Sequence, residues 1–140
     1  MLATLRIRRF NPDKAPEPYW QDFEVNWAPG TVVLYALHDI QENQDGTLAY
    51  RYSCRGAICG SCAVRINGEA ALACKVQLSA LDTSKPVVIE PLLNSHVIKD
   101  LVVDQEPFFQ SLRSILPWLS ESRLDPRQPF TLDETMSAAE

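Results

Sequence analysis

The chain of 140 residues is long enough for one globular domain with an appended segment. Its net charge of −5 argues against a nucleic-acid-binding surface, which needs a concentrated basic patch. No apolar run approaches the ~20 residues of a membrane-spanning helix, and the N-terminus lacks the pattern of a secretory or transit signal. We therefore expect a cytoplasmic protein that has no nucleic-acid partner, does not insert into a membrane and keeps its thiols reduced.

Alternation of apolar and polar residues predicts two strands near the N-terminus, LATLRIRRF and YWQDFEVNW. In the first strand, Ile7 and Phe10 are expected to lie on the apolar side. Arg6 and Arg8 share the other face, which we expect to be solvated. The connecting segment, NPDKAPEP, carries three prolines and favours turns, so the two strands should form a hairpin-like pair.

The central part of the chain changes from helical to strand-like patterning. Apolar residues in TVVLYALHDIQENQDG predict a helix near 32–43, with Thr31 as its N-cap and Gly46 at its end. LAYRYS is expected to be a short strand that leads into a cysteine-containing loop. The segments CAVRIN and EAALACKVQ should pair through an Asn67-Gly68 hairpin turn, and PVVIEPL should form another strand.

From about residue 105 the pattern becomes that of an amphipathic helix over 105–119, with Pro107 in its first turn. After Trp118 the sequence reads as a polar linker or tail. The strands with one helix before this point predict an α+β class, with one helix packed across a mixed sheet in a β-grasp-like layout. We therefore divide the chain into a domain at 1–104 and a helix with a linker at 105–140.

All four cysteines fall within one stretch, with the spacing C-x4-C-x2-C-x11-C. Three of them share a nine-residue loop and the fourth stands alone. This spacing is typical of the way in which plant-type ferredoxins bind a [2Fe–2S] cluster. Structural zinc usually takes its thiolates from two short C-x2-4-C turns, and disulfides are rare in a reducing compartment, so zinc and disulfides are the weaker alternatives.

The other residues of the loop suit an anionic cluster. Gly56 and Gly60 would let the backbone approach closely and direct N–H groups at the sulfurs. Ser53 and Ser61 could add hydroxyl donors or be ordinary surface residues. Arg55 could offset the negative charge of a cluster, face a partner protein or simply be exposed.

Three segments together resemble the iron–sulfur subunit of succinate dehydrogenase and fumarate reductase. They are YSCRGAICGSCAVRINGEAALACKV, VVIEPL and VIKDLVVDQEPFFQSLRSILPWL, and the resemblance covers nearly all of residues 2–120. It implies a ferredoxin-like domain in which the [2Fe–2S] ligands are Cys54, Cys59, Cys62 and Cys74.

The resemblance also implies partners. Electrons would pass between the FAD of a flavoprotein subunit and further clusters, with membrane quinone-binding subunits reached through a complex on the cytoplasmic face of the membrane. The family's [4Fe–4S] and [3Fe–4S] clusters belong to a C-terminal domain that is expected to be absent here. The chain could thus be a truncated form, a split subunit or a stand-alone ferredoxin serving another oxidoreductase. A zinc-binding interaction module is a further alternative.

Overall fold

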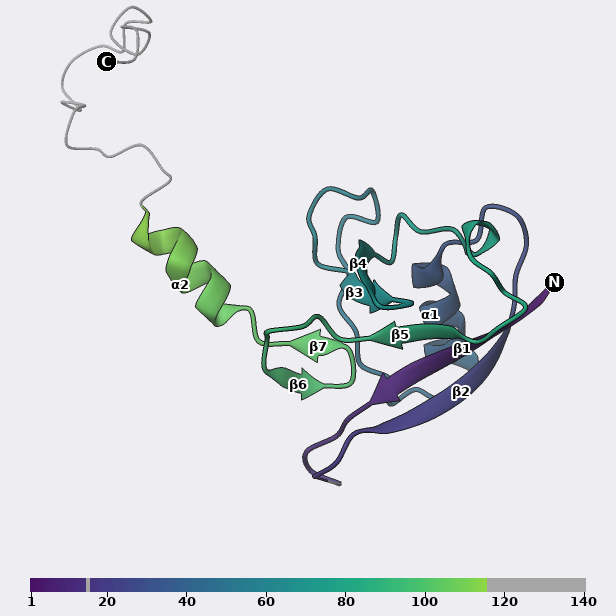
Figure 1. Cartoon of the computed structure of the whole chain (residues 1–140), viewed down its shortest axis with the longest axis horizontal. Coiled ribbons are helices and arrows are strands. Elements are labelled where there is room, and N and C mark those ends of the chain that lie inside the picture. Colours follow the sequence, from purple (N-terminus) through teal and green to yellow (C-terminus); the bar gives the residue numbers. More distant parts are fainter. Residues whose placement is uncertain (15, 116–140) are drawn as a thin grey trace, which may run out of the picture. The chain divides into compact units, whose positions relative to one another are not determined.

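The computed structural model describes residues 1–14 and 16–115. The chain divides into two compact units, Met1–Gln105 and one that begins at Glu106. In its described residues, the first unit contains seven strands, the helix α1 and the short 3-10 helix η1 (Leu78–Ala80), as Figure 1 shows.

Five of the described strands form one mixed sheet in the order β2-β1-β5-β3-β4. β1 (Leu2–Arg9) pairs antiparallel with β2 (Tyr19–Asn26), which confirms the predicted hairpin-like pair. On its other side β1 pairs in parallel with β5 (Val87–Glu90), which in turn pairs antiparallel with β3 (Ala63–Ile66). β4 (Glu69–Leu72) completes the sheet beside β3, with the register that the Asn-Gly turn predicts.

The helix α1 (Val33–Asn43) covers one face of this sheet (Figure 1) and confirms the predicted helix to within one residue at its start. Its apolar residues recur at three- and four-residue intervals, so they share one side of the helix. The same hydrophobic core takes in residues from β1, β2, β3 and β5. The predicted α+β layout is therefore confirmed. The buried helix residues are Val33, Leu34, Ala36, Leu37 and Ile40.

The start of α1 differs from the prediction in its capping. Val32, and not Thr31, occupies the N-cap position, and no side chain caps the helix. The first two helical N–H groups instead donate to the carbonyl oxygens of residues 76 and 73, each at 2.9 Å. Because a docked backbone segment satisfies these donors, the helix needs no capping hydroxyl. Docking across about forty residues of sequence is not visible in a local pattern.

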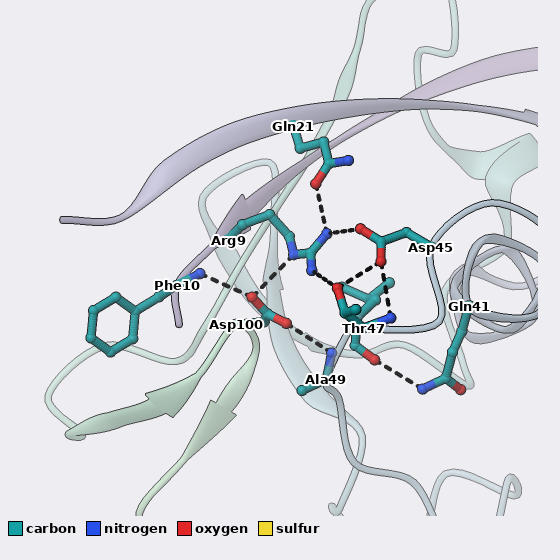
Figure 2. Close-up of polar contacts among 9 residues, drawn as sticks. Arg9, Phe10, Gln21, Gln41, Asp45, Thr47, Ala49 and Asp100 are labelled. Atoms are coloured by element: carbon teal, nitrogen blue, oxygen red, sulfur yellow. Dashed lines mark hydrogen bonds and ion pairs between the residues drawn. The ribbon is translucent and has the colours of Figure 1, made fainter. Parts of the chain in front are cut away.

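The first strand carries an unexpected residue on its core side. Ala3, Leu5 and Ile7 are buried in alternation, and the next residue in that alternation is Arg9, which is only 3% exposed. Phe10, which we had placed on the apolar side, is only partly buried. Figure 2 shows the Arg9 guanidinium within a set of polar partners.

The opposite face of β1 is more exposed, as predicted, and its two arginines pair with acidic neighbours. Arg6 forms a bidentate contact with Asp22 on β2, with distances of 2.8 and 2.7 Å. Arg8 lies 3.9 Å from Glu90 on β5.

One predicted strand is absent and two short strands were missed. Residues 48–53 were expected to be a strand, but they belong to none of the strands of the described chain. The missed pair is β6 (Val97–Lys99) and β7 (Val102–Val103), which form a separate two-stranded sheet. Strands of two and three residues are too short for a period-two pattern to be recognised.

In the second unit, α2 spans Glu106–Ser114 and has Pro107 in its first turn, as predicted. The remainder of the helix predicted over 105–119, and the predicted polar tail, lie beyond residue 115 and outside the described residues. No helix in the described part of the chain is both long and apolar enough to span a membrane.

Candidate metal centre

Two of the four cysteines flank the β3–β4 hairpin, and the other two lie in the loop that precedes it. Cys62 directly precedes β3, and Cys74 follows β4 by two residues. Asn67 (φ 50°) and Gly68 (φ 89°) make a tight turn with two left-handed residues, which brings the ends of the hairpin together. There the Ala73 N–H donates to the Cys62 carbonyl at 3.1 Å, so the backbone sets the spacing between Cys62 and the residue before Cys74.

Cys54 and Cys59 form a second pair, at the exposed side of the loop. The Cys59 N–H donates to the Cys54 sulfur at 3.4 Å, and the Cys54 N–H donates to the Cys59 sulfur at 3.5 Å. Cys62 and Cys74 are less accessible, since Cys62 is buried and Cys74 is partly buried. Burial raises the pKa of Cys62, whose thiol also interacts with that of Cys74. These contacts therefore divide the four thiols into two pairs.

The loop backbone turns N–H groups toward sulfur. Arg55, Ala57 and Gly60 all have positive φ, at 57°, 59° and 75°. Gly60 thus behaves as expected, whereas Gly56 does not adopt a positive φ and its two neighbours do. The Gly56 N–H nevertheless donates to the Cys54 sulfur at 3.3 Å. Alternation of left-handed with other conformations makes a concavity of N–H groups, which is suited to an anionic group.

Hydrogen bonding also prepares a thiolate. The hydroxyl of Ser61, with backbone N–H groups of Cys54 and Ser61, lowers the pKa of the Cys59 thiol to about 6. At neutral pH this favours the thiolate, which is the form of cysteine that binds metal ions. The Ser61 hydroxyl thus interacts with the Cys59 thiol, and its role toward a cluster stays a prediction.

An aromatic group beside the loop was not recognised in the sequence. The Arg55 guanidinium lies 5.3 Å from the centre of the Tyr52 ring. The His38 ring, which comes from α1, stands at 88° to the Tyr52 ring with a centroid separation of 4.5 Å. Tyr50 stacks against Tyr52 at 5.9 Å. A histidine on a helix gives no local sign of such contacts, because its partners come from residues 50–55.

A short hydrogen-bond relay joins this aromatic group to α1. The Gln41 side-chain amide donates to the Leu48 carbonyl at 2.9 Å, which leaves the amide oxygen of Gln41 facing Tyr50. The Tyr50 hydroxyl donates to that oxygen at 2.9 Å, so the Nδ1–H of His38 donates to Tyr50 across 2.7 Å. Burial, and then the charge of Arg55, lowers the pKa of His38, which favours this neutral form.

The donor set suits a two-iron cluster. Within residues 1–14 and 16–115, no group of three or more His, Cys, Asp or Glu side chains lies close enough together to hold a metal ion. Two pairs of thiols, with N–H groups directed at the sulfurs of the exposed pair, suit a centre in which each of two irons takes two protein ligands.

Comparison with known proteins agrees with this geometry. Residues 4–110 match the family described as the 2Fe-2S iron-sulfur cluster binding domain. The chain belongs to this family. The match includes the whole cysteine loop, and it confirms the [2Fe–2S] cofactor and the ferredoxin-like fold expected from the sequence. Which side chains bind the irons is not given by the match and is taken up below.

Among curated proteins, one relative is named "Succinate dehydrogenase [ubiquinone] iron-sulfur subunit 3, mitochondrial" and comes from Arabidopsis thaliana. The chain is 44% identical to it over 124 residues, and this alignment covers 87% of the chain and 40% of the relative. It is also 44% identical over 123 residues to the mitochondrial succinate dehydrogenase iron-sulfur subunit of Candida glabrata, which covers 86% of this chain and 48% of the relative. The chain thus spans less than half the length of these two relatives.

Among solved structures, a chain of the Mycobacterium smegmatis Sdh1 complex in its apo form superposes with a TM-score of 0.79 at 29% identity. The superposition covers 95% of this chain and 55% of the other. The resemblance to succinate dehydrogenase iron–sulfur subunits drawn from the sequence is confirmed by these similarities.

Proposed function

We propose that this chain is the electron-transfer part of a succinate dehydrogenase or fumarate reductase iron–sulfur subunit. The observation that carries the proposal is the cysteine loop, in which backbone N–H groups are directed at the sulfurs of the exposed pair, Cys54 and Cys59. The similarity to succinate dehydrogenase subunits adds the kind of complex. When bound, the cluster supplies one-electron chemistry, and we expect the dicarboxylate to react on the flavoprotein subunit.

The cysteines of the loop would bind the irons, and its backbone N–H groups would donate to the sulfurs. We assign Cys54 and Cys59 to one iron and Cys62 and Cys74 to the other, because these are the pairs that the fold brings together. The N–H groups of the loop stabilise negative charge on the exposed pair of sulfurs, which affects the reduction potential.

The tip of the loop suits contact with a flavoprotein subunit. Ile58 is 88% exposed there, and the nearby Tyr52 and Tyr35 are 43% and 53% exposed. Exposed aromatic and aliphatic side chains of this kind are common at protein interfaces. The FAD would belong to the flavoprotein, and membrane quinone-binding subunits would be reached through the complex, on the cytoplasmic face of the membrane.

The domain division follows from this function. Residues 1–104 would form the [2Fe–2S] domain, and 105–140 would begin the connection to a domain that carries the [4Fe–4S] and [3Fe–4S] clusters in longer members of the group. Electrons would therefore pass between the flavin and those clusters through this domain.

The first test is the cofactor. Protein purified without oxygen should contain two irons and two acid-labile sulfides per chain and, after dithionite reduction, give the EPR signal of one reduced [2Fe–2S] centre. Zinc in place of iron, when iron was supplied during expression, would overturn the proposal and favour a zinc-binding module.

The second test separates a subunit of a complex from a stand-alone ferredoxin. The purified protein is mixed with the FAD-containing succinate dehydrogenase subunit of the same cell, and succinate is added. We expect the [2Fe–2S] EPR signal to appear with wild type and to be lost with Ile58→Asp, which places a charge on the contact surface. A wild-type cluster that dithionite reduces, but that succinate and flavoprotein do not, would indicate a ferredoxin with another partner.

A further inference from the structure

The segment that leads into the cysteine loop, residues 48–53, has no ladder of backbone hydrogen bonds to hold it. Its first two residues are instead held by distant parts of the chain. The Leu48 carbonyl accepts from the Gln41 side chain at 2.9 Å. The Ala49 N–H donates to the Asp100 carboxylate at 2.9 Å, and the Ala49 carbonyl accepts from the Leu101 N–H at 3.2 Å. These contacts set where the chain begins its approach to Cys54.

The Asp100 carboxylate makes one of these contacts and also binds the end of β1 (Figure 2). Its side chain is 1% exposed, and one carboxylate oxygen accepts from the Arg9 Nε at 3.0 Å and from the Phe10 N–H at 2.9 Å. The second oxygen accepts from the Ala49 N–H. The Asp100 N–H in turn donates to the Phe10 carbonyl at 2.9 Å. Asp100 therefore links the end of β1 to the start of the loop segment.

Arg9 compensates the buried charge. One of its terminal nitrogens contacts Asp45 at 2.7 Å and Gln21 at 2.6 Å, and the other donates to the Thr47 hydroxyl at 3.0 Å. Burial opposes its charge, but hydrogen bonds to Asp45 and Asp100 raise the pKa of Arg9 above its ordinary value. The guanidinium is thus fixed on all sides and holds the Asp100 carboxylate in one orientation.

Asp100 lies in a tight connection between two short strands and has an unusual backbone conformation. It stands between β6 and β7, in the two-stranded sheet that precedes the end of the first unit at Gln105. Its φ of +48° is in the left-handed region, which aspartate tolerates better than most residues. The chain therefore places a rarely adopted conformation at the residue whose carboxylate reaches the loop segment.

We propose that Asp100 is a positioning residue for the cluster: through its hydrogen bond to the Ala49 N–H it fixes residues 48–53, the segment that leads to Cys54 and Cys59. This inference rests on the proposed cluster ligands. Hydrogen bonds from backbone N–H groups to the cluster sulfurs stabilise the more negative, reduced state of the cluster. If the segment moves, these hydrogen bonds weaken and the reduction potential falls. The Asp100 carboxylate and the Leu101 N–H thereby join the β6–β7 sheet to the segment that leads into the cysteine loop.

Asp100→Asn tests the proposal with almost no change of shape. The amide oxygen can still accept from Arg9 and Phe10, but an NH₂ group then faces the Ala49 N–H, donor against donor. Two controls accompany it. Gln21→Ala removes one hydrogen bond of the same arginine without touching residues 48–53, and Ile7→Val weakens the core at a fully buried position of β1.

The reduction potential is measured on the cluster-loaded full chain by EPR-monitored titration, with iron content and thermal midpoint recorded for each variant. We expect Asp100→Asn to keep two irons per chain but to lower the equilibrium constant for one-electron reduction about threefold to tenfold, where tenfold is 59 mV. The g values should change with it. Both controls should lower the thermal midpoint and keep the wild-type potential.

An Asp100→Asn protein with the potential and g values of wild type, and a thermal midpoint lowered only as in Ile7→Val, would overturn the inference. If this variant does not accumulate, the Ala49 N–H is replaced by an ester oxygen, which removes the same bond and leaves every side chain in place. An ester variant with the wild-type potential would overturn the inference, and one with a lowered potential would support it. A wild-type chain without iron would instead refute the proposed function.

Discussion

The two arms that lead into and out of the cysteine loop are held in different ways. The outgoing arm consists of β3 and β4, which are bonded to each other and, through β3, to β5. The incoming arm, residues 48–53, lies in no strand of the described chain and is anchored by Gln41, Asp100 and Leu101. Ladder hydrogen bonds thus fix the surroundings of Cys62 and Cys74, whereas a few distant contacts fix the approach to Cys54.

This difference indicates where the centre can be adjusted. A ladder distributes its strength over several backbone hydrogen bonds, so no single side chain decides its position. An arm held by individual side chains can be changed by one substitution. The incoming arm also carries Tyr50 and Tyr52, which contact the side chains of His38 and Gln41 on α1. We therefore expect the properties of the cluster to depend more on the incoming than on the outgoing arm.

The largest effect should come from removing a ligand on the incoming side. Cys59→Ala leaves the Cys62 and Cys74 thiols in place, but they can hold only one of two irons. We expect less than about a tenth of the wild-type [2Fe–2S] EPR signal, because thiolate ligands hold such clusters. The control is Ile58→Ala, a change of the neighbouring exposed residue that should leave iron and sulfide content unaltered. Full cluster content in Cys59→Ala would refute the ligand assignment.

The next largest effect should fall on stability. Arg9→Met leaves Asp100 buried without its cation, which costs about 3–5 kcal/mol for a broken buried ion pair. The control lies on the same strand: Arg6→Met removes an exposed pair with Asp22 and should change stability far less. Urea unfolding of the two variants, followed by circular dichroism without oxygen, measures the difference. Similar losses for both would contradict the buried role of Arg9.

Much of the sheet and helix to which the two arms are attached could be predicted from the sequence. The alternation in β1 and β2, the helical period of α1 and the Asn67-Gly68 turn each arise from neighbouring residues, so local patterns reveal them. The cysteine spacing likewise identifies the kind of cofactor. These features place the outgoing arm almost completely, since a hairpin is a local structure.

The supports of the incoming arm could not be predicted in the same way. LAYRYS alternates like a strand, yet its backbone contacts the side chains of residues 41 and 100 in place of another strand. In the sequence RIRR, Arg9 cannot be distinguished from the more exposed arginines beside it. Its burial is explained by its ion pair with Asp100, 91 positions away. A possible signal was the strict alternation that puts Arg9 on the same side as Leu5 and Ile7. The alternation places the residue but does not name its partner.

A smaller effect is expected when the turn of the outgoing arm is altered. Gly68→Ala introduces a side chain at φ +89°, where an L-residue costs roughly 1–2 kcal/mol. Asn67 remains tied to β5, because its side chain accepts from the Val88 N–H at 2.9 Å. We therefore expect lower stability with an unchanged reduction potential, the reverse of the pattern for Asp100→Asn. A potential that shifts in Gly68→Ala would remove the distinction between the two arms.

The smallest effect should be a pH dependence of stability that comes from His38, whose ring contacts the tyrosines of the incoming arm. Burial and Arg55 lower the pKa of His38 in the folded protein, so unfolded chains bind a proton there that folded chains do not. Stability from this histidine is therefore fully present above about pH 6.5, the ordinary histidine value, and is lost as pH falls toward the folded pKa. The groups that face the ring are Arg55 from the loop, Glu42 and Tyr35 from α1, and the two tyrosines of the arm.

His38→Gln should remove this part of the pH dependence while keeping a side chain that can donate to Tyr50. We expect the thermal midpoint of the cluster-loaded wild type to decline more between pH 7 and pH 5 than that of His38→Gln, with the two converging toward acid. His96→Gln, at an exposed position between β5 and β6, is the control and should follow the wild type. Parallel declines in all three proteins would mean that His38 does not couple protons to folding. The relay through Tyr50 would then hold the arm without making it sensitive to pH.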